Sequence, residues 1–231
     1  MPLAKPTSEM LLLQTKSEPQ GLLPTGRKEG GAVMKAYSQA NRGKPFEDFL
    51  KFVHQRYQQS GTACVHKVPT EFIPIRNARG EVCNCKCEEK SCVDYLGRYR
   101  STPVAVEAKH EEGARIAFNR VEPHQADYMD DYTKDPEAVG IVIVSFSLRR
   151  FFAVPWEFWK AARDAWNNKP NPKSTKAPVE TVKAYGWEWQ TPGMASVSPE
   201  QLLPEWEIRA GGTTGLPYLN IIDRMKGGHT E

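Results

Sequence analysis

The segment 141–146 constrains the fold most, because every position in it except Ser145 is apolar. A strand with one solvated face alternates apolar and polar residues, whereas a continuous apolar run indicates a strand covered on both faces. We therefore predict a central strand with helices packed on either side of a sheet, which is the α/β arrangement. The run is far shorter than the roughly 20 apolar residues of a membrane-spanning helix, so no membrane segment is expected.

Two amphipathic helices are predicted to cover this sheet. The first begins at Pro45, a residue favoured at the start of a helix, and ends at Gly61. In both helices apolar side chains recur at helical spacing: Phe46, Phe49, Leu50, Val53 and Tyr57 in the first, and Trp156, Trp159, Ala162 and Trp166 in the second. We assign the tryptophans to packing against the sheet rather than to stacking on nucleic-acid bases.

The remaining elements follow from shorter patterns. Strands are expected at residues 62–68, 104–109 and 151–154, a weak strand at 202–208, a helix at Pro123–Tyr132 and a short terminal helix at 219–225. Residues 167–183 are rich in Lys and Pro and are expected to form a loop. Together these elements predict a mixed sheet of about five strands flanked by helices.

The N-terminal region differs from the rest of the chain in composition. Residues 1–37 lack apolar periodicity, and we predict a mobile arm there, followed by a folded domain at 38–226 and a tail at 227–231. Residues 1–44 hold seven basic and three acidic side chains, whereas the net charge of the whole chain is only +3. A basic arm suits a polyanionic partner, but a solvated tail without a partner has the same composition.

Glu107 and Lys109 share one face of the predicted strand 104–109, whose other face is aliphatic. Alone, the pair is more typical of an ion pair on a solvated sheet face than of a catalytic site. Asp94 changes this interpretation, because a turn at Leu96-Gly97 between antiparallel strands would place Asp94 beside Glu107. Two carboxylates near a lysine can cleave phosphodiesters, since the acids bind a cation such as Mg²⁺ and the lysine stabilises the transition state.

The pattern Asp-x12-Glu-x-Lys is the sequence form of the PD-(D/E)xK nuclease superfamily, and five blocks of this chain resemble the RecU family of Holliday junction resolvases. The blocks are Asn41-Arg42-Gly43 before a helix carrying Glu47, the segment 65–70, Asp94-Tyr95-Leu96-Gly97, the segment 106–109, and His124-Gln125 before Met129. The resemblance extends from about Asn41 to Met225. It implies a restriction-endonuclease-like mixed sheet flanked by helices, with a protruding stalk at about residues 71–92.

The resemblance also implies roles for single residues. Asp94 and Glu107 match acidic ligands of Mg²⁺, for which Mn²⁺ can substitute, and Gln125 matches a glutamine that completes the metal site. Lys109 matches a lysine that stabilises the transition state. Glu47 matches an acid that approaches the catalytic site in many nucleases of the superfamily. A glutamate in the first turn of a helix is equally well explained by the helix dipole.

The function that the resemblance implies is an Mg²⁺-dependent endonuclease that resolves Holliday junctions by paired symmetric nicks during recombination. Because a four-way junction is two-fold symmetric, a homodimer is expected, and a recombinase is a further candidate partner. Arg42 and Lys67 match basic positions suited to phosphate contacts, although isolated residues of this kind are often simple surface charges. Two alternatives stay open: a duplex-nicking nuclease of the superfamily, and a non-catalytic DNA-binding or recombination-regulating protein with the same fold.

Four of the five cysteines lie within ten residues, at Cys83, Cys85, Cys87 and Cys92. The N-terminus lacks the pattern of a secretion signal, so we expect a cytoplasmic protein with reduced thiols. Four thiolates suit a structural zinc ion, and a zinc-stapled stalk is one interpretation; reduced loop thiols are the other. Cys92 also stands where the resembled family usually has a threonine that contributes to the metal site, and a thiol is a poor ligand for Mg²⁺.

Overall fold

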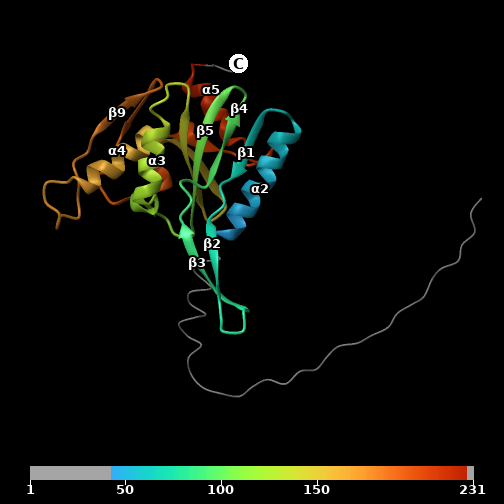
Figure 1. Cartoon of the computed structure of the whole chain (residues 1–231). Helices are drawn as coiled ribbons and strands as arrows, with labels where there is room; N and C mark the ends of the chain where they lie inside the picture. Colours follow the sequence, from blue (N-terminus) through green and yellow to red (C-terminus); the bar gives the residue numbers. More distant parts are fainter. Residues whose placement is uncertain (1–42, 228–231) are drawn as a thin grey trace, which may run out of the picture.

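A six-stranded mixed sheet forms the centre of the computed structural model, which describes residues 43–227 except for the side chains of 87–89 (Figure 1). The predicted arm and Arg42 lie outside the described residues. The sheet order is β1-β4-β5-β7-β8-β12, and only β5 and β7 pair in parallel. The strands are β1 (Ala63–Lys67), β4 (Tyr95–Tyr99), β5 (Thr102–Glu111), β7 (Val139–Phe146), β8 (Arg150–Pro155) and β12 (Glu207–Ile208).

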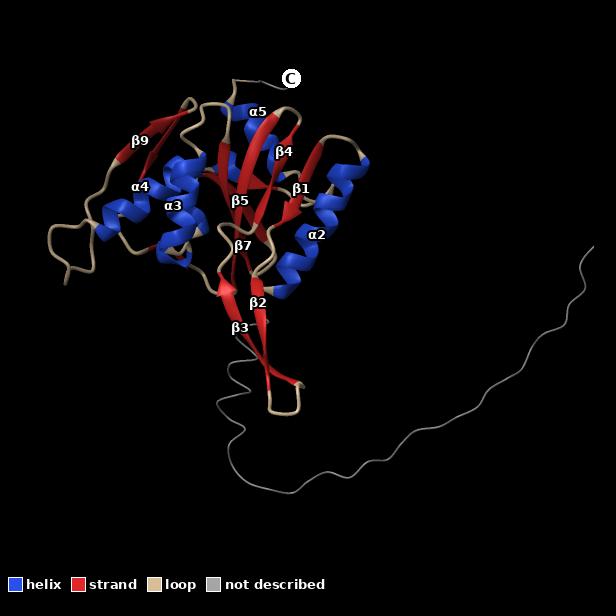
Figure 2. Ribbon diagram, in the orientation of Figure 1, coloured by secondary structure: helices blue, strands red, loops and turns tan. Residues whose placement is uncertain are grey.

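Helices cover both faces of this sheet, as the continuous apolar run predicts. All eight residues of β7 are buried. Helix α2 (Lys44–Gln59) lies on one side of the sheet, and α3 (Pro123–Tyr132) and α4 (Trp156–Asn167) lie on the other (Figure 2). The predicted α/β class is thus confirmed. No helix in the described part of the chain is long and apolar enough to cross a membrane.

The predicted apolar stripes of α2 and α4 face the sheet. In α2 the stripe packs through Phe46, Leu50, Val53 and Tyr57, all of which are buried. In α4, Trp156 and Trp159 are buried in the core, whereas Trp166 is half-buried and lies under the ammonium of Lys169, 3.5 Å from the ring centroid. The assignment of Trp156 and Trp159 to packing is therefore confirmed.

The predicted turn at Leu96-Gly97 is wrong, because both residues lie inside β4. The chain turns instead at Arg100 and Ser101, after Tyr99 pairs with Thr102. Gly97 mimics a turn signal in the sequence, but its actual role is a close approach between strands. A Cβ atom added there would lie 2.1 Å from the Cys64 carbonyl oxygen. The β4–β5 hairpin nevertheless brings Asp94 beside Glu107, as expected.

Gly97→Ala should therefore destabilise the protein by roughly 3 kcal/mol or more, because β1 must move away from β4 to admit the methyl group. Gly113→Ala is the matched control, since the nearest atom to its added Cβ is a Glu111 side-chain oxygen 3.4 Å away. The control should change the free energy of unfolding by less than about 1 kcal/mol. Urea titration measures both values. Equal stabilities of the two variants would contradict the close approach of β1 to Gly97.

A second, two-stranded sheet protrudes from the main body beside α2 (Figure 2). It consists of β2 (Glu71–Arg76) and β3 (Val82–Glu89), which pair antiparallel. Every residue of β2 is exposed, including Phe72, which keeps 60% of its surface accessible. This hairpin is the predicted stalk between the early strands, and it is called the stalk below.

The region after α4 contains structure that the sequence patterns do not predict. The strands β9 (Thr181–Ala184) and β10 (Trp187–Gln190) form a hairpin whose Trp187 and Trp189 contact Phe158 of α4. The predicted loop thus overlaps β9, and the predicted strand 202–208 is a strand only in β12. The other short elements are β6 (Ile116–Ala117), β11 (Ser196–Val197), η1 (Phe118–Arg120), η2 (Pro199–Gln201), η3 (Pro204–Trp206), η4 (Tyr218–Asn220) and α5 (Ile221–Met225).

His54 is a buried titratable group that links α2 to the C-terminal segment. Its Nε2 lies 2.7 Å from the Tyr218 hydroxyl oxygen, and its ring contacts Tyr95 edge-on at 4.7 Å between centroids. Burial, with a smaller contribution from His66, lowers the pKa of His54 to about 4. The folded protein therefore keeps this imidazole neutral at pH values at which the unfolded chain binds a proton.

The stability of the protein should consequently fall as the pH drops from 6.5 towards 4, because only the unfolded state gains a proton at His54 in that window. The loss attributable to this group is at most about 3 kcal/mol, at 1.36 kcal/mol per pKa unit. His54→Gln keeps a polar partner for Tyr218 but does not titrate. Urea unfolding at several pH values should give a shallower acid loss for this variant. Parallel curves would contradict a buried neutral His54.

Candidate active site

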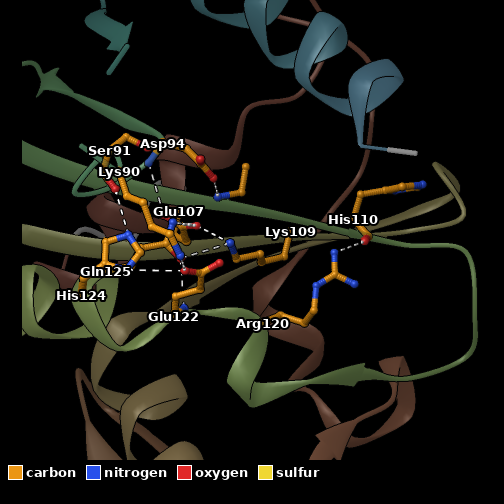
Figure 3. A network of polar contacts seen from close by, with 11 residues as sticks. Lys90, Ser91, Asp94, Glu107, Lys109, His110, Arg120, Glu122, His124 and Gln125 are labelled. Carbon is orange, nitrogen blue, oxygen red and sulfur yellow. Dashed lines mark hydrogen bonds and ion pairs between the residues drawn. The ribbon is translucent and has the colours of Figure 1, made fainter. Parts of the chain in front are cut away.

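Four of the predicted site residues converge between the β4–β5 hairpin and α3 (Figure 3). Asp94 directly precedes β4, Glu107 and Lys109 lie on β5, and Gln125 lies in the first turn of α3. The register pairs Tyr95 with Val106, which places the neighbouring residues Asp94 and Glu107 at adjacent positions. Glu107 thereby contacts Asp94 and Gln125, which lie 13 and 18 residues away from it in the sequence.

Hydrogen bonds fix both carboxylates. The backbone N–H of Asp94 donates to Glu107 Oε2 at 3.2 Å, and the backbone N–H of Ala108 donates to Asp94 Oδ2 at 2.9 Å. Lys109 forms an ion pair with Glu107 Oε1, and the amide Nε2 of Gln125 donates to the same oxygen at 2.7 Å. The strand pairing of β4 with β5 thus orients the acids through the backbone itself.

Glu107 is the most buried member of the cluster, with no exposed side-chain surface. Burial, followed by the negative charge of Asp94, raises the pKa of Glu107 to about 8, although Lys109 acts in the opposite direction. Ionising both Asp94 and Glu107 costs free energy, because the two carboxylates are adjacent, Glu107 is fully buried, and the described contacts include only one cation, Lys109. A second cation bound by both acids would relieve this cost, so the electrostatics fit a metal site.

The chemistry of the donors suits Mg²⁺, which prefers oxygen ligands and keeps several waters. Among the described residues, no three or more His, Cys, Asp or Glu side chains lie close enough together to hold one metal ion. A cation at Asp94 and Glu107 would therefore complete its shell with water or backbone oxygens. The residues present fit such a weakly chelated Mg²⁺ ion better than a zinc ion, which needs three or four protein ligands.

The orientation of the Gln125 amide follows from its partners. Its Oε1 accepts a hydrogen bond from the backbone N–H of Glu122 at 3.0 Å and lies 3.4 Å from Lys109 Nζ. Both partners are donors only, so the amide oxygen must face them and the NH₂ group must face Glu107. Gln125 thus contacts Glu107 and Lys109, but in this arrangement its oxygen is already engaged and its NH₂ group orients Glu107.

Glu47 and Lys67 form an ion pair with each other between α2 and β1, and both side chains are about half-exposed. Within the described residues, no hydrogen bond or ion pair joins either of them to Asp94, Glu107 or Lys109. They line a groove of about 560 Å³ together with residues from α2, β1 and β4, among them Lys44, Lys51 and Tyr95. Tyr95, the residue after Asp94, is the β4 residue that lines this groove.

The four-cysteine zinc site, one of the two interpretations of this segment, is not found among the described side chains. Cys83 and Cys85 are exposed on the stalk, whereas Cys92 is half-buried at its base and contacts Tyr128. The side chain of Cys87 lies outside the description. Along an extended strand, Cys83 and Cys87 are roughly 13 Å apart, which is too far for two ligands of one ion. Alternation places cysteines on one face but does not gather them.

Lys90 and Glu122 lie around the cluster and are not singled out by the sequence patterns. Lys90 pairs with Glu122 at 2.5 Å, and His124 Nε2 donates to the Ser91 carbonyl at 3.2 Å. Glu122 also caps α3, since its side chain accepts the Gln125 backbone N–H while the Gln125 side chain accepts that of Glu122. A capping box is readable in a sequence, and Glu122-Pro123-x-Gln125 is a form of it with Pro at the first helical position.

The family model and the similar proteins found by sequence point to one family. Residues 41–224 match the family model of RecU, described as recombination protein U. Proteins from the Streptococcus pneumoniae strains Hungary19A-6 and CGSP14, each called Holliday junction resolvase RecU, are 26% identical over 201 residues. The alignment covers 83% of this chain and 88% of each relative. Among solved structures, the resolvase Hjc of Archaeoglobus fulgidus has a TM-score of 0.33 and 10% identity, over 48% of this chain and 78% of that chain.

Proposed function

The chain belongs to the RecU family of recombination proteins, and from this premise we propose that it is an Mg²⁺-dependent endonuclease that resolves Holliday junctions. The observation that supports this most is the convergence of Asp94, Glu107 and Lys109. A protein that only bound DNA would have no need to bury a carboxylate beside a second carboxylate. The cluster therefore favours a catalytic function over the non-catalytic alternative.

Each residue of the cluster has a role in phosphodiester hydrolysis. Asp94 and Glu107 would hold the cation, which when bound polarises the scissile phosphate and lowers the pKa of a coordinated water. The Lys109 ammonium, which is largely buried, is placed to stabilise the negative charge that develops on the phosphate in the transition state. Gln125 keeps Glu107 and Lys109 in register by contacting both side chains.

The substrate assignment rests on symmetry and on the relatives. The similar proteins are called Holliday junction resolvases, and a four-way junction has two equivalent cleavage positions. We infer that two copies of this chain act together, each making one nick, so that the paired nicks are symmetric. The stalk would enter the junction, while Lys67 and the basic residues before residue 43 would contact phosphates.

Cleavage of a synthetic mobile junction and a matched linear duplex tests this proposal. With Mg²⁺ or Mn²⁺ the junction should be cut into two nicked duplexes, while the linear duplex should be cut far more slowly. With a chelator, binding should persist and cleavage should stop. Equal cleavage of both substrates would favour the duplex-nicking alternative, and junction binding without cleavage under any metal condition would favour the non-catalytic one.

A further inference from the structure

The stalk and the catalytic cluster meet at the base of the stalk. Strand β3 ends at Glu89, and the chain reaches Asp94 within five residues. Between them, the carbonyl of Ser91 accepts a hydrogen bond from His124 Nε2 at 3.2 Å (Figure 3). Since a carbonyl oxygen can only accept, this ring nitrogen must be the donor. The first turn of α3 is thereby attached to the return strand of the stalk.

The same turn of α3 holds the catalytic side chains. His124 stands next to Gln125, and the capping box with Glu122 fixes the Gln125 side chain relative to the helix. Gln125 in turn donates to Glu107 at 2.7 Å and faces Lys109 at 3.4 Å. The stalk base is therefore linked to Glu107 and Lys109 by the His124 hydrogen bond, the backbone of the first turn of α3 and the Gln125 hydrogen bonds.

Besides the contact of Cys92 with Tyr128, Lys90 and Ser91 at the stalk base each contact the start of α3, and these two contacts differ in strength. The ion pair of Lys90 with Glu122 is open to solvent, with side-chain exposures of 65% and 49%, and such pairs contribute between zero and about 1 kcal/mol. The His124 side chain is only 35% exposed, and it bonds to a backbone carbonyl that moves with the stalk itself. His124 is therefore the more effective link.

The stalk needs such a link to influence the site. A two-stranded hairpin without a covering layer is marginally stable, so contacts at its base set its direction. We propose that His124 is a positioning residue: when junction DNA is seated on the stalk, Ser91 holds His124, and the first turn of α3 then holds Glu107 and Lys109 in their working arrangement. DNA that does not engage the stalk leaves this arrangement looser and is cut slowly. This inference rests on the proposed function.

Three variants test the link. His124→Phe keeps an aromatic ring but removes the hydrogen-bond donor. His124→Gln offers an amide NH₂ group at a similar reach. Lys134→Ala is the control, because it breaks only an exposed ion pair beyond the other end of α3. In single-turnover cleavage of junctions, His124→Phe should be about tenfold slower, within the range of energetic couplings between sites. Its junction affinity in chelator should stay unchanged, and its ratio of junction to duplex cleavage should fall. His124→Gln should recover most of the rate, and Lys134→Ala should match the parent protein.

Hydrogen exchange without metal gives a second measure that does not depend on activity. Junction binding in chelator should slow amide exchange at residues 124–126 in the parent protein and in His124→Gln, but not in His124→Phe. If the parent protein cleaves junctions and His124→Phe matches it in rate, substrate preference and exchange, the inference is overturned while the proposed function stands. If the parent protein does not cleave junctions, the proposed function itself fails. His124→Ala, which also lacks the donor, repeats the test if the Phe ring is not tolerated.

Discussion

Asp94→Asn and Glu107→Gln should each abolish junction cleavage, lowering the rate by about 10³-fold or more. The amide side chains fit the same space but carry no charge, so they can neither hold a cation strongly nor balance its charge. Junction affinity in chelator should stay the same or rise, because removing an anion near phosphate does not weaken electrostatic attraction. Rates are measured with the enzyme in excess, and affinities by gel shift under the same salt.

Glu112→Gln is the matched control for these two variants. Glu112 follows β5 directly and pairs with His110, but its side chain is 64% exposed and makes no described contact with Asp94 or Glu107. It should cleave at the parent rate. Melting temperatures of all three variants verify that they fold. Full activity of Asp94→Asn together with Glu107→Gln would remove this cluster from the mechanism.

Lys109→Met should lower the cleavage rate by about 10²-fold while changing junction affinity little, since the loss of one preorganised transition-state contact has this size. Methionine matches the length of the lysine side chain without its charge. Lys67→Met is the informative comparison, because Lys67 is exposed and pairs with Glu47 instead of Glu107. We expect that variant to bind junctions more weakly, with a smaller salt dependence, and to cleave bound junctions normally.

These two lysine variants separate a catalytic role from a binding role. If Lys109→Met cleaved at the parent rate once bound and only its affinity fell, Lys109 would be a phosphate contact. If Lys67→Met lost its cleavage rate at saturating protein, the groove between α2 and β1 would have to be part of the catalytic site.

The central strand and the Glu107/Lys109 face could be predicted from the sequence because both follow from local periodicity. The position of the hairpin turn could not. Gly97 is a half-buried strand residue where an added Cβ would clash with β1, and a glycine at such a position resembles a turn signal. The chain instead turns at Arg100, whose φ is 51°. The turn of the β9–β10 hairpin is easier to recognise in the sequence, because it contains a glycine, Gly186. Both turn residues, Tyr185 and Gly186, have a positive φ, which glycine adopts without strain.

The sequence could not predict which side chains contact each other when they lie far apart along the chain. Residue types alone do not show that Glu47 pairs with Lys67, 20 residues away, or that the Gln125 oxygen faces Lys109 and the backbone of Glu122. For the same reason the cysteine count allowed a zinc site, while the extended backbone of β3 spaces Cys83, Cys85 and Cys87 along the strand. Counting candidate ligands sets an upper limit on a site, and only the fold determines which of them meet.

Cleavage of a supercoiled plasmid that extrudes a cruciform distinguishes a resolvase from other nucleases. With Mg²⁺, one encounter should give linear DNA whose two nicks lie at symmetric positions in opposite strands of the cruciform junction. The Asp94→Asn protein should leave the plasmid supercoiled. Nicked circles without linear product, or equal nicking of a relaxed plasmid that has no cruciform, would contradict a resolvase that acts by paired nicks.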